Sequence, residues 1–277
     1  MAVARIAITL CLLVAASATV TVSEPDPISA VCPIVYRLDE SPSAHGYHYV
    51  FFGNAFFINE QGYLLTAAHV LETFRDGGQP FILVNRPNSP PRLLQVTVIA
   101  TDSAHDVAVL RATPNPFASN YQVAFLPLAS DRVVPGQSVV ALSLHPPKLQ
   151  NAHTFDLPLE DRSEGEVLSY ESTQLDKSAP ATDIFLLSHS VTRGQSGSPV
   201  LALDTHATPS GVVGLIEGRW LRTSALALTT SAHLSATASS AAVIPGAAIP
   251  ISHAITLLQQ KSIPFHAAPG SSPPTHP

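Results

Sequence analysis

The chain has 277 residues, of which 45% are hydrophobic and 12% are charged, and its formal net charge is -6. This length and composition are typical of a globular protein with enough apolar residues for one large or two small hydrophobic cores. The acidic balance excludes the basic surface that binds nucleic acids or anionic membranes, so we expect neither as a partner.

The first residues, MAVARIAITLCLLVAASA, have the pattern of a secretory signal peptide. Arg5 precedes an apolar run at residues 6–16, and small residues end the stretch at Ala18. The run is shorter than the ~20 residues of a transmembrane helix, which disfavours an uncleaved anchor. We therefore expect a signal peptide over residues 1–18, an N-terminal segment over residues 19–30, and an exported protein, periplasmic or extracellular, without a membrane partner in its mature form.

The two cysteines do not predict a disulfide framework. Cys11 lies in the predicted signal peptide, where Leu10 before it does not fit a lipoprotein site. Cys32 is then alone, so the exported fold must be held by its core. Its place beside Pro33, at the start of an apolar run, favours a small buried hydrophobic residue over a nucleophile.

Short apolar runs, separated by Gly, Pro, Asn and Asp, dominate the chain from residue 31 to residue 218 and predict β-strands. The clearest of these runs are residues 49–58, 93–100, 105–112, 137–144 and 211–218. Many short strands and no internal repeat predict an all-β protein of two barrels or a sandwich. The pattern alone does not distinguish the two.

Helical periodicity is clear in one late stretch, IPISHAITLLQQK, where Ser252 can cap the helix and Pro264 prevents its continuation. Residues 223–242, rich in Ala, Ser and Thr, are expected to form a long surface loop. Residues 262–277 read as a disordered Pro/Ser-rich tail.

Ser196 lies in the stretch Gly194-Gln195-Ser196-Gly197-Ser198-Pro199. A serine hydroxyl becomes a nucleophile only beside a base, and the oxyanion that it creates needs donors already in place. Glycines on both sides allow a sharp turn that presents the N–H groups of Gly194 and Ser196 to one point. A tight turn between strands is the alternative interpretation, so the serine needs a base elsewhere in the chain.

His69, one of twelve histidines, is the best candidate for that base. It ends the stretch GYLLTAAHV, which places the imidazole at a strand end, although a histidine in a helical turn would also fit. A buried carboxylate should accept the other imidazole N–H. Asp106, directly before a Val-Ala-Val-Leu run, is the natural choice, because burial of its charge requires a partner. Asp102, in a polar turn, is the alternative, and His105 would only shield the loop.

The chain order His69, Asp106, Ser196 separates the fold families that share this chemistry. Subtilisins have the order Asp, His, Ser, and α/β-hydrolases have the order Ser, Asp, His. The α/β-hydrolase turn also requires a glycine where Ser198 stands, and no strand-to-helix pattern surrounds Ser196. Only the order found in chymotrypsin fits this sequence.

With these residues, and with the stretches GNAFFINEQGYLLTAAHV, HDVAVL, TRGQSGSPV and GAAIPISHAITLLQQ, the chain resembles the trypsin-like serine peptidases of the chymotrypsin clan, in particular the bacterial HtrA-type catalytic domain. The resemblance implies a chymotrypsin-like double β-barrel with a C-terminal helix over residues 31–261. It also implies an endopeptidase that hydrolyses polypeptides through an acyl-enzyme, without metal or organic cofactor. His69 would be the general base, Asp106 its orienting carboxylate, Ser196 the nucleophile, and Gly194 and Ser196 the oxyanion hole.

Three departures from the family pattern limit which family properties we expect in this protein. Gln195 stands where animal digestive enzymes have an aspartate that binds a newly freed N-terminus, so activation by that ion pair is not expected. Ser198 replaces a glycine, a change that many bacterial relatives have. HtrA-type proteins usually continue into a peptide-binding PDZ domain. We expect none here, because few residues follow the predicted helix.

Substrate preference is predicted from spacing within the resemblance. Ser190 lies six residues before the nucleophile, where enzymes that select Arg or Lys carry an aspartate. Gly214, Leu215 and Ile216 are expected to line the opposite wall and to pair with the substrate backbone as an edge strand. We expect small or aliphatic residues at the P1 position of the substrate.

Two other classes of function stay open at this point. The first is a binding or sensor module that keeps the protease fold without turnover. The second is a zinc protein, prompted by the number of histidines. The chain has no H-x-x-x-H or C-x-x-C spacing, and His45 with His48 is too little for a site.

Overall fold

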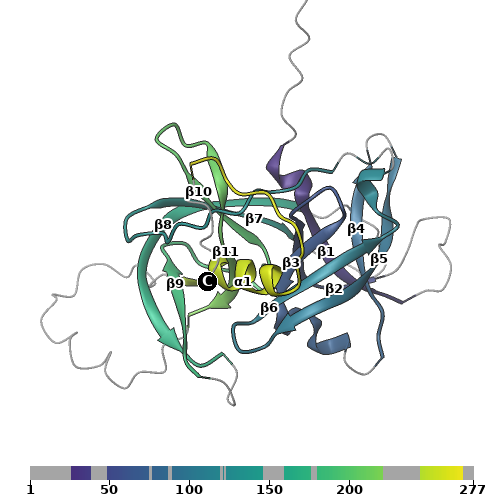
Figure 1. Cartoon of the computed structure of the whole chain (residues 1–277), viewed down its shortest axis with the longest axis horizontal. Coiled ribbons are helices and arrows are strands. Elements are labelled where there is room, and N and C mark those ends of the chain that lie inside the picture. Colours follow the sequence, from purple (N-terminus) through teal and green to yellow (C-terminus); the bar gives the residue numbers. More distant parts are fainter. Residues whose placement is uncertain are drawn as a thin grey trace, which may run out of the picture.

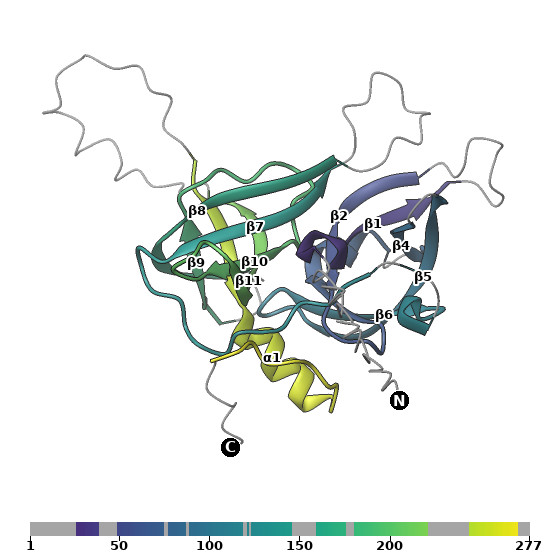
Figure 2. The same cartoon turned by 90° about the horizontal axis from the view of Figure 1, so that it is seen from above.

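The computed structural model describes residues 26–38, 49–74, 77–86, 89–118, 121, 123–145, 159–175, 180–220 and 244–270. Two closed six-stranded β-barrels lie side by side, and one α-helix, α1, lies next to both (Figures 1 and 2). This confirms the predicted all-β, chymotrypsin-like fold with a C-terminal helix and excludes the sandwich. Each of the apolar runs named above lies in or largely within a strand.

The first barrel has the strand order β1-β2-β3-β6-β5-β4, and all its neighbours are antiparallel. Its strands are β1 (Val31–Arg37), β2 (Tyr49–Phe57), β3 (Tyr63–Ala67), β4 (Pro80–Arg86), β5 (Ser89–Asp102) and β6 (Val107–Thr113). The 3₁₀-helices η2 (Ala68–Phe74) and η3 (Pro116–Ala118) follow β3 and β6. Cys32 is buried in the core of this barrel, and burial raises the pKa of its thiol, which agrees with a hydrophobic role.

The second barrel has the strand order β10-β11-β12-β9-β8-β7, also antiparallel. Its strands are β7 (Ser138–His145), β8 (Leu159–Thr173), β9 (Thr182–Leu187), β10 (Pro199–Leu203), β11 (Pro209–Arg219) and β12 (Gly246–Pro250). The long strand β8 alternates inward and outward side chains along its first half, as expected for a strand with one wet face.

A continuous apolar cluster joins the two barrels. It contains Phe56 and Val109 from the first barrel, Leu142 and Leu215 from the second, and Ile255 from α1. The 3₁₀-helix η1 (Pro27–Ala30) adds Ile28 and Ala30 to it. Apolar area buried at this seam stabilises one relative position of the barrels, and the site described below depends on that position.

Helix α1 (Ile251–Gln260) confirms the predicted helix and contacts β6 of the first barrel and β11 of the second. The expected cap is wrong. The helix starts directly after Pro250, so Ser252 is its second residue, and the N-cap makes no side-chain hydrogen bond.

The predicted tail begins too early, because residues 262–270 pack onto the barrels. Ile263 and Ala268 are buried, and the carbonyl oxygen of His266 accepts a 2.8 Å hydrogen bond from the Leu128 N–H. Asn59 Nδ2 donates to Pro264 O at 2.6 Å. The apolar residues Ile263 and Phe265 explain the packing.

Several of the sequence predictions concern residues outside the described ranges: the signal peptide, residues 19–25 of the N-terminal segment, the loop at residues 223–242, and the end of the tail from residue 271. In the ranges that the structure describes, no helix has the length and apolar character needed to cross a membrane.

Candidate active site

His69 lies where strand β3 ends and η2 begins, in the first barrel. The strand residues before it are buried, whereas the His69 side chain is 38% exposed. The apolar run therefore ends at the barrel surface, and the imidazole faces the seam. This agrees with the predicted placement at a strand end, although the backbone of His69 itself belongs to the 3₁₀-helix η2.

Asp106 lies in the turn between β5 and β6 and is 7% exposed. Its Oδ2 is 2.7 Å from His69 Nδ1, and its Oδ1 accepts a 2.7 Å hydrogen bond from the His69 backbone N–H. The Asp106 carbonyl oxygen also accepts from the Ala68 N–H at 3.0 Å. Its backbone is left-handed, with φ 54°. Two hydrogen bonds thus hold this carboxylate against His69 and offset the cost of burying its charge. The backbone bond to Ala68 fixes the turn that carries it.

Asp102, the alternative carboxylate, does not contact His69 in the structure. Its Oδ2 lies 2.7 Å from His105 Nδ1, and its Oδ1 accepts from the N–H groups of Ala104 and His105. The ring of His105 stacks on that of His253, with the ring centroids 4.1 Å apart. Asp102 therefore shapes its own turn, and Asp106 is the carboxylate that the fold brings to His69.

Ser196 lies in the loop between β9 and β10, which we call the nucleophile loop (residues 192–198). Gly194 and Gly197 have φ values of 97° and 80°, which other residues adopt only with strain. The carbonyl oxygen of Ser196 accepts a 2.8 Å hydrogen bond from the Asn54 N–H of β2. A Cβ added to Gly197 would meet Asn54 O and Thr66 Oγ1, so this loop packs directly on β2 and β3.

The hydroxyl of Ser196 donates to the carbonyl oxygen of Glu217 at 3.1 Å. Within the part of the chain that the structure describes, no hydrogen bond joins Ser196 Oγ to the imidazole of His69. The fold therefore brings His69 and Asp106 into contact and places Ser196 on the adjoining loop.

Within the part of the chain that the structure describes, not every backbone donor of the nucleophile loop has an acceptor. The N–H groups of Gln195, Gly197 and Ser198 donate to carbonyl oxygens. Among the described residues, by contrast, the N–H groups of Gly194 and Ser196 have no acceptor. Unpaired donors on either side of one residue are the arrangement that binds a developing negative charge.

The carboxylate of Glu217 adds negative charge beside the imidazole. Burial would lower the pKa of His69. The hydrogen bond to Asp106, together with the negative charges of Asp106, Glu217 and Glu72, outweighs burial and raises that pKa above its ordinary value. Burial raises the pKa of Glu217, and the charge of Asp106 adds to the effect while that of His69 opposes it.

The structure does not place the three predicted wall residues of β11 where a substrate could pair with them. Gly214, Leu215 and Ile216 are buried between β10 and β12, and Ile216 exchanges backbone hydrogen bonds with Gly197 and Ser198. The part of β11 that continues past the start of β10 and lies beside Ser196 is Glu217, Gly218 and Arg219. The three predicted wall residues are therefore paired within the barrel, which the sequence does not show because it does not reveal where β10 begins.

Ser190 is exposed, and its hydroxyl donates to the Ile244 carbonyl oxygen at 2.8 Å. The described residues contain no group of three or more His, Cys, Asp or Glu side chains arranged to hold a metal ion.

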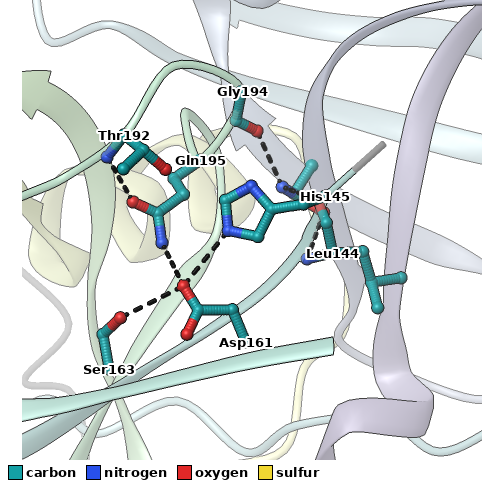
Figure 3. Close-up of polar contacts among 8 residues, drawn as sticks. Leu144, His145, Asp161, Ser163, Thr192, Gly194 and Gln195 are labelled. Carbon is teal, nitrogen blue, oxygen red and sulfur yellow. Dashed lines mark hydrogen bonds and ion pairs between the residues drawn. The ribbon is translucent and has the colours of Figure 1, made fainter. Parts of the chain in front are cut away.

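Four polar residues near the nucleophile loop were not predicted: Asn54, His145, Asp161 and Glu217. Figure 3 shows the contacts that Asp161 makes with Gln195, His145 and Ser163. Asn54 interrupts the apolar stretch FFGNAFF, and Glu217 interrupts GLIEG. A polar residue inside an apolar strand requires a partner when buried, and that signal could have found both.

The comparisons with known proteins agree with this geometry. A family model described as a trypsin-like peptidase domain matches residues 53–215. The search of the curated proteins gave no match.

Among solved structures, the apo protease domain of MamO from Magnetospirillum magneticum has a TM-score of 0.54 at 16% identity, and the match covers 83% of this chain and 96% of that one. The active form of the Rv3671c protease from M. tuberculosis has a TM-score of 0.54 at 16% identity, and the match covers 88% of this chain and 86% of that one. The HtrA-type protease AlgW with a decapeptide has a TM-score of 0.53 at 16% identity, and the match covers 84% of this chain and 64% of that one. At these identities the structures establish likeness of fold. With a family model that spans more than half of its length, this chain belongs to the trypsin-like peptidase domain family.

Proposed function

We propose that this protein is an exported serine endopeptidase that hydrolyses polypeptides through an acyl-enzyme on Ser196. The observation that carries the proposal is the buried Asp106 carboxylate, 2.7 Å from the His69 imidazole, beside a glycine-flanked serine in a trypsin-like peptidase fold. Such a pair converts a neutral histidine into an oriented base.

The chemistry follows from the positions of the side chains. Nδ1–H of His69 donates to Asp106, which leaves Nε2 as the basic nitrogen. For attack, the Ser196 hydroxyl rotates from the Glu217 carbonyl towards Nε2, since catalytic hydrogen bonds often tighten only when substrate is bound. Ser196 Oγ bonds to the carbonyl carbon of the substrate, its proton passes to Nε2, and that proton then leaves with the amine. Water cleaves the resulting ester by the same route.

The oxyanion formed in both steps would be bound by the N–H groups of Gly194 and Ser196, which have no acceptor among the described residues. The substrate backbone would pair with Glu217, Gly218 and Arg219, where β11 extends past β10. Ser190, a neutral residue, supports a preference for small or aliphatic P1 residues over Arg or Lys.

The experiment compares the wild type with Ser196→Ala, His69→Ala and, as a matched control in the same loop, Ser198→Ala. A fluorophosphonate probe should label the wild type and Ser198→Ala but not Ser196→Ala. Peptide hydrolysis should fall on the order of 10⁴- to 10⁶-fold in Ser196→Ala and His69→Ala. Asp106→Asn should be severe as well, through the wrong imidazole tautomer, whereas Asp102→Asn should retain most activity.

A folded wild type that neither reacts with the probe nor cleaves a peptide library would instead support a binding module with a silent protease fold. Export is tested separately by expression with the native leader. The mature protein should appear outside the cytoplasm with an N-terminus near residue 19, and retention of residues 1–18 would contradict this part of the proposal.

A further inference from the structure

The side chain of Gln195 lies inside the nucleophile loop, directly before Ser196, and is 2% exposed. Its Oε1 accepts a 2.6 Å hydrogen bond from the Thr192 N–H, which closes the loop on itself. Its Nε2 donates to Asp161 Oδ2 at 2.9 Å (Figure 3). Both ends of a buried amide are thus satisfied, one inside the loop and one outside it.

Asp161 lies on β8, on the less exposed face of that strand, as does Ser163, and the Asp161 side chain is 38% exposed. Its Oδ2 accepts a hydrogen bond from the Ser163 hydroxyl at 3.2 Å, in addition to the one from Gln195 Nε2. The same oxygen lies 3.1 Å from Nε2 of His145, at the end of β7 (Figure 3). Hydrogen bonds to an ionised acceptor are about twice as strong as bonds between neutral groups. The carboxylate is therefore a firm external attachment for the Gln195 amide.

A second attachment holds the neighbouring residue of the loop. Asn54 Nδ2 donates to the Gly194 carbonyl oxygen at 2.9 Å and to the Leu144 carbonyl oxygen at 3.2 Å. Asn54 Oδ1 accepts from the Leu144 N–H at 3.1 Å. Asn54 thus connects Gly194 to Leu144, and Asp161 connects Gln195 to His145, the next residue of β7.

These attachments bear on the two donors that the proposed reaction needs. The bond to the Gly194 carbonyl fixes the peptide plane between Gly194 and Gln195, and the side-chain bonds of Gln195 fix the residue between the two unused N–H groups. A glycine-containing loop has many backbone conformations without such restraints, and a donor aids catalysis only if it is already in place.

We propose that Asp161, supported by His145, is a positioning residue: it fixes the nucleophile loop through Gln195 and so keeps the oxyanion donors aimed. This inference rests on the proposed function. Because Gln195 is uncharged, it cannot form an ion pair. Its amide instead attaches the loop to a carboxylate of the second barrel.

The test compares Asp161→Ala with Glu164→Gln, which removes one negative charge from the exposed face of the same strand. Asp161→Ala should lower kcat about 10- to 100-fold. Complete loss of one oxyanion donor lowers kcat about 10²- to 10³-fold, and a loosened loop should cause a smaller reduction, because the donors are still present. KM should change less than about threefold. The affinity for a peptide aldehyde, which forms a tetrahedral adduct on Ser196, should fall by a similar factor as kcat. Glu164→Gln should match the wild type.

A reciprocal exchange tests the contact without a large cavity. In Gln195→Glu, the new carboxylate faces that of Asp161, and their repulsion should lower kcat at least tenfold. Combining it with Asp161→Asn restores a donor facing an acceptor, because the new amide donates to the new carboxylate. The double variant should recover to within about threefold of the wild type. Failure of the double variant to exceed Gln195→Glu would overturn the proposal.

Hydrogen–deuterium exchange over residues 192–198 provides a readout that does not need activity. Exchange should increase in Asp161→Ala and stay unchanged in Glu164→Gln. A folded Asp161→Ala with wild-type kcat and wild-type exchange would overturn the proposal, as would a defect confined to KM. If the wild type itself is inactive and unlabelled at Ser196, the proposed function fails, while the exchange result still decides whether Asp161 holds the loop.

Discussion

Asn54→Ala should destabilise the protein strongly, because one fully buried amide connects the two barrels. The Asn54 side chain makes three hydrogen bonds, to the carbonyl oxygen of Gly194 and to both backbone groups of Leu144. Each is worth about 1–1.5 kcal/mol net, and alanine leaves two buried backbone groups of Leu144 and the half-buried Gly194 carbonyl oxygen unpaired. The expected loss is therefore about 3–5 kcal/mol of the free energy of unfolding, a large part of the ~5–15 kcal/mol of an ordinary domain.

Guanidinium unfolding followed by fluorescence measures this loss, with a second variant as control. Asn115→Ala removes an amide that makes two hydrogen bonds, to Glu60 O and from the Phe117 N–H, at the surface. Water replaces them there, so the control should lose less than about 1 kcal/mol. If Asn54→Ala were no less stable than Asn115→Ala, the role of the buried amide as a bridge between the barrels would be refuted.

Two further predictions concern the proposed active site. The raised pKa of His69 keeps the imidazole protonated to higher pH, so kcat/KM should rise with pH around a midpoint above the ordinary ~6.5. Glu217→Gln removes a nearby negative charge and should lower that midpoint. The pH dependence of kcat/KM, measured for both proteins, checks this. A wild-type midpoint at or below about 6.5 that is the same in Glu217→Gln would contradict the reasoning. Gly194→Ala should reduce kcat roughly ten- to hundredfold, because φ is 97° and the new Cβ would lie 2.9 Å from Phe51 Cε1. Gly77→Ala, at φ 94° with nothing within 4 Å, controls for backbone strain and should keep wild-type kcat.

The sequence was sufficient for the features that depend on local pattern and on chemical necessity. Alternating apolar runs predicted the strands, because a strand with one buried face has a period of two residues. The association of His69 with Asp106 was predicted because a carboxylate directly before a buried strand needs a partner, and the structure joins the two at 2.7 Å. The wrong cap at Ser252 and the early start of the tail are errors of boundary, where local pattern is least informative.

Features that depend on register were not predictable in the same way. The predicted wall residues of β11 proved to be paired with β10 and β12, because the pairing of β10 with β11 decides which residues lie beyond the strand edge. The contacts of Asp161 with Gln195 and of Asn54 with Gly194 join residues 34 and 140 positions apart in the chain. Neither partner has a local pattern that specifies the other.

The proposed active site therefore depends on the packing of the barrels as much as on its own residues. The first barrel supplies His69 and Asp106, and the second supplies Ser196 and the β11 edge. Their relative position is fixed by the shared apolar cluster and by Asn54, whose amide spans the seam. Since the apolar cluster is non-directional and the amide is directional, the cluster supplies most of the attraction between the barrels, and the amide determines where the nucleophile loop lies on β2. Loss of the amide should consequently affect the alignment of Ser196 with His69 even where the two barrels stay folded.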